Sequence, residues 1–187
     1  MPGSGRVTHP PPGLPGGRPW GRMVRLTHGI VAALVLVNLL RDDTDFWHRA
    51  LGYAAAGLVL LRLLWAAATA RRHATGLGLS LKATWGYLRA RAPRQPGHDP
   101  LGLWMVWLLW SLIGLLALTG WMSRLDAWWG DEQLHDLHAS LADVLGVAVC
   151  VHVVSIGLMS WHWRQNLPAA MLGLTPGARR HTPPDQH

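Results

Sequence analysis

Four histidines lie within or at the ends of long apolar stretches of this 187-residue chain: His28, His48, His138 and His152. Ionisable side chains are costly inside a bilayer, so histidines in such stretches are candidates for function. Two neutral imidazoles facing each other inside a helix bundle are what a b-type haem needs at its iron. The other histidines fall in or beside tails, loops and interfaces, with His135 as a rival to His138; they are His9, His73, His98, His162, His181 and His187.

The spacing of His138 and His152 indicates that the two side chains lie at different depths in the membrane. On one helix, a separation of fourteen residues turns about 1,400°, roughly 40° short of four full turns, and advances about 21 Å. The two rings therefore lie on one face. His135 lies about 100° from His152 by the same arithmetic, which ranks it below His138.

Four apolar segments must position these side chains. They run approximately over 23–40, 47–70, 101–122 and 137–161, and each is near the roughly 20 residues that a helix needs to cross the hydrocarbon. Half of all residues are hydrophobic and only 14% are charged, which is typical of a membrane protein. Because a backbone in lipid must satisfy its polar groups internally, the sequence predicts an all-α fold, an integral membrane four-helix transmembrane bundle.

The four segments make one expected domain, residues 20–175. Residues 1–19 are rich in Pro and Gly and are expected to form a disordered leader. Residues 176–187 are expected to form a flexible basic tail.

The distribution of basic residues predicts the orientation. Arginines and lysines gather in the N-terminal flank, in the connection between the second and third segments, and in the C-terminal tail: Arg6, Arg18, Arg22, Arg25, Arg71, Arg72, Lys82, Arg89, Arg91, Arg94, Arg164, Arg179 and Arg180. The other two connections hold most of the acids, so the positive-inside rule places both termini in the cytoplasm. The formal charge of +7 therefore fits a membrane protein, and we expect no nucleic-acid partner.

This orientation pairs the histidines by depth. Helix four enters from outside, which puts His138 near the outer surface and His152 deeper. Helix one enters from inside, so His28 should meet the level of His152. Helix two enters from outside, so His48 should meet the level of His138. The expected pairs are His28/His152 at an inner haem and His48/His138 at an outer haem.

The surroundings of these pairs fit a haem that is not covalently attached. Cys150 is the only cysteine, which excludes a CxxCH attachment site. Arg62 lies fourteen residues after His48, where it could pair with a propionate of the inner haem or snorkel to the interface. Small residues near the ligands could admit a macrocycle or serve as ordinary helix contacts; they are Gly52, Gly57, Ala142 and Gly146.

The chain resembles the bacterial four-helix b-type cytochromes, which include cytochrome b561 and the cytochrome b subunits of nickel-iron hydrogenases. The matching stretches are RLTH (25–28), HRALGY (48–53), LRLLW (61–65), GHDPLG (97–102), LTGW (118–121), LHASLADVLGVAVCVH (137–152) and RQNLPAAMLG (164–173). The chain departs from the usual pattern at Ala139, where relatives have an acidic residue, and at Asp99, where they have Asn.

The resemblance implies two non-covalent haems b bound by His28, His48, His138 and His152. It also implies electron transfer in the bacterial inner membrane between the quinone pool and a redox partner protein, such as a cytochrome c, a hydrogenase or a dehydrogenase. A homodimer is a further expectation. An iron with two histidine ligands has no open position, so it exchanges electrons without binding substrate.

Other functions remain open from the sequence. The histidines could serve a proton or divalent-metal transporter, although intramembrane carboxylates are scarce. The chain could also be a structural anchor for a larger enzyme, which would not predict pairing by depth. The sequence does not identify a quinone pocket; His135, Asp143 and Arg124 are candidates near the outer haem.

Overall fold

The computed structural model describes residues 21–41, 46–70, 100–162 and 166–172. The expected leader, the basic connection and the tail lie outside these residues. Within them every regular element is helical, and the chain runs through α1 (Arg22–Leu39), α2 (Phe46–Ala70), α4 (Pro100–Met122), the 3₁₀ turn η1 (Asp126–Trp128), α5 (Glu132–His162) and α6 (Leu167–Leu172). Four of these helices, α1, α2, α4 and α5, are long and apolar enough to cross a membrane. The predicted all-α, four-span fold is confirmed.

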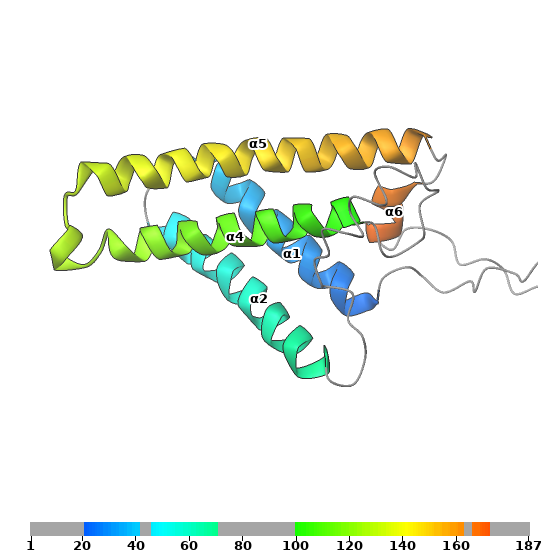
Figure 1. Cartoon of the computed structure of the whole chain (residues 1–187), viewed down its shortest axis with the longest axis horizontal. Helices are drawn as coiled ribbons and strands as arrows, with labels where there is room; N and C mark the ends of the chain where they lie inside the picture. The colour runs from blue at the N-terminus through cyan, green and yellow to red at the C-terminus, as the bar shows by residue number, and fades with distance from the viewer. Residues whose placement is uncertain (1–20, 42–45, 71–99, 163–165, 173–187) are drawn as a thin grey trace, which may run out of the picture.

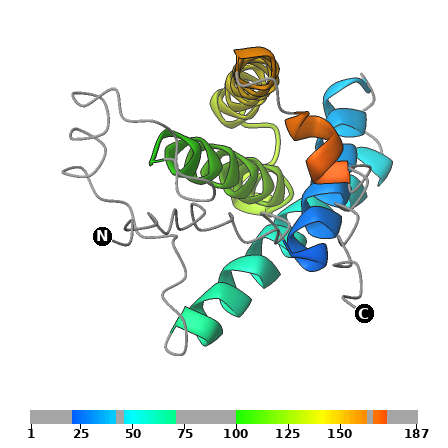
Figure 2. The ribbon, with the colours of Figure 1, turned by 90° about the vertical axis from the view of Figure 1, so that its right-hand side faces the viewer.

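The long helices form two antiparallel hairpins. Helices α1 and α2 pack together, α4 and α5 pack together, and α2 contacts α4 to join the hairpins. In Figure 1 the α4–α5 hairpin runs along the length of the molecule and the α1–α2 hairpin crosses it obliquely. Figure 2 shows α6 between the end of α5 and α1, and α6 contacts both.

The interior is small and the outer faces are apolar. The buried cluster where the hairpins meet consists of Val35, Ala55, Val59, Leu112, Ile113, Leu145 and Ala148. Large apolar side chains remain exposed along the helices, for example Leu61 at 62% and Val147 at 65%. Such a surface would be unfavourable in water and is the one that lipid chains solvate.

The bounds of the helices differ little from those expected, except at α5. Helices α1, α2 and α4 each begin one residue before the predicted position. Helix α5 begins at Glu132, five residues before the start of its apolar run, because Asp131 caps it: its Oδ1 accepts a hydrogen bond of 2.9 Å from the Leu134 amide. Gly130, with φ of 78°, makes the turn that precedes the cap, a conformation that glycine adopts without steric cost.

Candidate functional site

One histidine pair joins α1 to α5. The ring centroids of His28 and His152 are 6.3 Å apart, with an angle of 50° between the ring planes. His28 lies in the second turn of α1 and His152 in the last third of α5. Two helices from different hairpins therefore present imidazoles to each other near the α6 end of the bundle.

A second pair joins α2 to α5. The ring centroids of His48 and His138 are 6.2 Å apart, and the planes meet at 64°. His48 lies in the first turn of α2 and His138 in the second turn of α5, so this pair lies near the η1 end of the bundle. The structure thus brings together the same pairs that the depth argument expected. Helix α5 contributes one ring to each pair, about 21 Å apart along its axis.

The spacing within each pair suits a single metal ion between the rings. Imidazole nitrogen–metal bonds are about 2 Å long, so two rings on opposite sides of one ion have centroids roughly 6 Å apart. Both observed separations match that span. Among the described residues no group of three or more His, Cys, Asp or Glu side chains could hold a metal ion. The donor set is therefore two pairs of histidines, which suits an ion whose other ligands come from a macrocycle.

The helices that carry the paired histidines differ in how closely their backbones approach one another. Helix α5 packs closely on α4, whereas few of its backbone atoms come near the backbones of α1 and α2, so each histidine pair joins two helices that are not closely packed neighbours. A Cβ added at Gly57 or Gly146 would meet no atom within 4 Å, while one at Gly52 would meet Asn38 Nδ2 at 3.5 Å. Gly57 is exposed, so the open space at its backbone lies on the outer surface of the helices.

The ring of His138 is held from α4. Thr119 Oγ1 lies 2.7 Å from His138 Nδ1, and a Cβ added at Gly120 would lie 3.3 Å from His138 Cε1. Neither residue was predicted from the sequence as part of the site, although both lie in the LTGW stretch (118–121) that carries part of the resemblance. The available signal was that Thr119 is one of two hydroxyl residues, with Ser111, in an otherwise apolar helix.

Arg62 is a half-buried cation on α2. Its Nη1 is buried and has no hydrogen-bond partner among the described residues, and its Cζ lies 4.8 Å from the centroid of the Trp65 ring. Stacking on an aromatic face stabilises a guanidinium but leaves its N–H donors unused. A buried donor of this kind is what an anionic group such as a propionate would satisfy.

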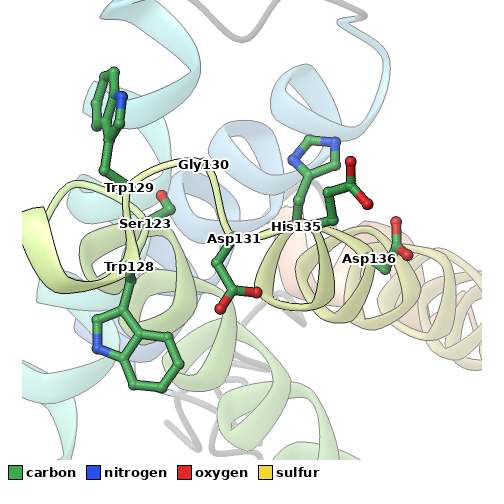
Figure 3. Close-up of a pocket in the computed structure, with 8 residues that line it drawn as sticks. Ser123, Trp128, Trp129, Gly130, Asp131, His135 and Asp136 are labelled. Carbon is green, nitrogen blue, oxygen red and sulfur yellow. The ribbon is translucent and has the colours of Figure 1, made fainter.

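The residues considered for a quinone pocket are not gathered in one place. His135 lines an open cavity of about 510 Å³ around the α4–α5 connection, together with Ser123, Trp128, Trp129, Gly130, Asp131, Glu132 and Asp136. In Figure 3 the side chains around this cavity diverge, with Trp128 and Asp131 on one side of the loop and Trp129 and His135 on the other. Arg124 and Asp143 are exposed and do not line it.

Comparison with known proteins assigns the family. No curated protein and no solved structure matches the chain. The family model described as prokaryotic cytochrome b561 matches residues 19–174, which include all four long helices and both histidine pairs. The chain therefore belongs to the prokaryotic cytochrome b561 family and is a multi-pass membrane b-type cytochrome of electron transfer.

Proposed function

We propose that this chain is a di-haem cytochrome that conducts electrons between the two faces of the membrane. His28 and His152 would hold one haem b, and His48 and His138 the other. One observation supports this most strongly: two separate histidine pairs, 6.3 and 6.2 Å between centroids, each join α5 to the opposite hairpin. An anchor subunit would have no need of two such pairs.

The residues of the chain determine what kind of redox reaction is possible. Haem b with two histidine ligands supplies one-electron transfer at an iron that has no free coordination position. His28 is exposed and His48, His138 and His152 are half-buried among the described residues, so surrounding lipid and the bound group would cover the rings. Helix α5 sets the distance between the two sites, about 21 Å along its axis. A quinone or a partner protein would therefore exchange electrons at the edges of the bundle, without binding to the metal.

Arg62 would act on the inner haem. Its buried, unpaired Nη1 supplies a cation at the level expected for a propionate of that haem. Pairing would remove the cost of a buried guanidinium with unused donors.

The His28/His152 pair would lie toward the cytoplasm. Both termini would be cytoplasmic, because the basic flanks follow the positive-inside rule, and the membrane would be the bacterial inner membrane. Electrons would pass between the quinone pool and a redox protein such as a cytochrome c, a hydrogenase or a dehydrogenase.

The test is the haem content of the purified protein and of single-histidine variants. The wild type should give a reduced-minus-oxidised spectrum with a b-type α-band and two haems per chain by pyridine extraction. His138→Ala and His48→Ala should each give one haem per chain, because each removes one ligand of the same pair. An absence of haem in the wild type would contradict the function as a cytochrome and would leave transporter and anchor functions.

His135→Ala is the matched control. His135 lies on α5 one turn before His138 but belongs to neither pair, so this variant should keep two haems per chain. If His138→Ala removed both haems from a protein that still inserted in the membrane, the proposed pairing would be wrong.

A further inference from the structure

Helix α4 contains no histidine, yet it contacts the ring of one. We infer that Thr119 is a positioning residue for His138: its hydroxyl oxygen accepts a hydrogen bond from Nδ1–H and thereby leaves Nε2 unprotonated to bind iron. This inference rests on the proposed role of His138 as a haem ligand. It adds the hydrogen bond that selects the tautomer able to bind iron.

The two carbonyl oxygens beside Thr119 Oγ1 favour one direction for the contact with His138. Thr119 is 5% exposed, and its Oγ1 lies 3.0 Å from the carbonyl oxygen of Leu115 and 3.2 Å from that of Leu116. A hydroxyl has one hydrogen to donate, and a carbonyl oxygen can only accept. When the Thr119 hydrogen goes to a carbonyl, the lone pairs of Oγ1 face His138 Nδ1 at 2.7 Å. The proton of this bond then belongs to Nδ1.

The tautomer decides whether His138 can be a ligand. A neutral imidazole has one protonated and one free nitrogen. With Nδ1 protonated, the free nitrogen is Nε2. The opposite arrangement, with the threonine donating to Nδ1, would put the proton on Nε2 and block ligation through that atom.

A hydrogen bond from the second ring nitrogen also changes the ligand electronically. Such bonds fix ring orientation and raise the basicity of a metal-bound histidine. A more basic ligand stabilises the oxidised iron, so Thr119 should lower the midpoint potential of the haem at the His48/His138 pair. The other pair lies too far along α5 to share this effect.

The test compares Thr119→Val, Thr119→Ser and Thr27→Val in the complete haem-loaded protein. Valine replaces the hydroxyl with a methyl of similar size, whereas serine retains the hydroxyl. Thr27 is the matched control on α1, because its Oγ1 makes the same backbone bonds, 2.8 Å to the Met23 oxygen and 3.1 Å to the Val24 oxygen, and no imidazole is among its hydrogen-bond partners in the described part of the chain.

The measurements are the two midpoint potentials from an optical redox titration and the low-spin ferric EPR signals, with His138→Ala identifying the signal of the remaining haem. Thr119→Val should raise the potential of the outer haem and shift its EPR signal, leaving the inner haem unchanged. Thr119→Ser should behave nearly as wild type, and Thr27→Val should change neither haem. Loss of the outer haem in Thr119→Val with recovery in Thr119→Ser would also support the inference.

Two results would overturn it. Unchanged potentials and EPR signals in Thr119→Val would show that the hydroxyl does not act on His138, and loss of the outer haem in both valine and serine variants would show that the hydroxyl is not what matters. Retention of two haems in His138→Ala would instead contradict the proposed function itself. The two failures are therefore distinguishable.

Discussion

At the scale of residues, the candidate site combines paired histidines with residues that contact one of their rings. The paired histidines reach across between helices of different hairpins. Two residues of α4 contact the ring of His138. Thr119 lies within hydrogen-bond distance of it, and Gly120 leaves space for it because glycine has no side chain. The histidines could be predicted from sequence because their spacing on α5 follows helix geometry. Thr119 and Gly120 could not be predicted in this way, because their contact with His138 depends on how α4 packs against α5.

Gly120→Ala tests the second neighbour. The new Cβ would lie 3.3 Å from His138 Cε1, closer than an ordinary contact, so the ring must move by a few tenths of an ångström. We expect a shifted EPR signal for the haem at the His48/His138 pair and partial loss of that haem, measured by pyridine extraction.

Gly114→Ala is the control, since a Cβ there meets nothing within 4 Å on the same helix. Both changes carry the same gain in helix propensity, about 1 kcal/mol, which the comparison cancels. Equal spectra for the two variants would mean that Gly120 does not constrain the ring.

At the scale of elements, apolar length predicted the four spans but not where each helix begins. Helix α5 starts at Glu132 because a capping carboxylate, Asp131, and a glycine with positive φ, Gly130, precede it. A hydropathy profile detects neither feature. The short elements η1 and α6 were not predicted either. At α6, Asn166 Oδ1 accepts a bond of 3.0 Å from the Ala169 amide, a local polar contact that starts a helix too short for a hydrophobic pattern to reveal.

Asp131→Ala should destabilise the start of α5. Removing the cap leaves the Leu134 amide without its side-chain acceptor, which typically costs about 1 kcal/mol. The melting temperature of the detergent-solubilised protein should fall, as measured by circular dichroism. Asp131→Asn keeps a side-chain oxygen and should stay close to wild type; a similar loss in both variants would point to the charge instead of the cap.

At the scale of the whole molecule, the expected orientation can be tested by labelling. In a Cys150→Ser background, which removes the single native cysteine, a cysteine introduced by Ala127→Cys should react with a membrane-impermeant maleimide in cells whose outer membrane is permeabilised. A cysteine introduced by Ser4→Cys should react with the same reagent only after the inner membrane has also been permeabilised. The reverse pattern would invert the topology and exchange the inner and outer pairs.

The loose approach of α5 to α1 and α2 has a consequence for how such a protein matures. Each hairpin satisfies its own backbone polar groups, so both can insert before any cofactor arrives. If the paired rings ligate iron, cofactor insertion adds two links between α5 and the other hairpin to the α2–α4 packing that already joins the hairpins. The helices would then insert and pack first, and haem supply would control when α5 is attached to α1 and α2 through the metal-bound rings.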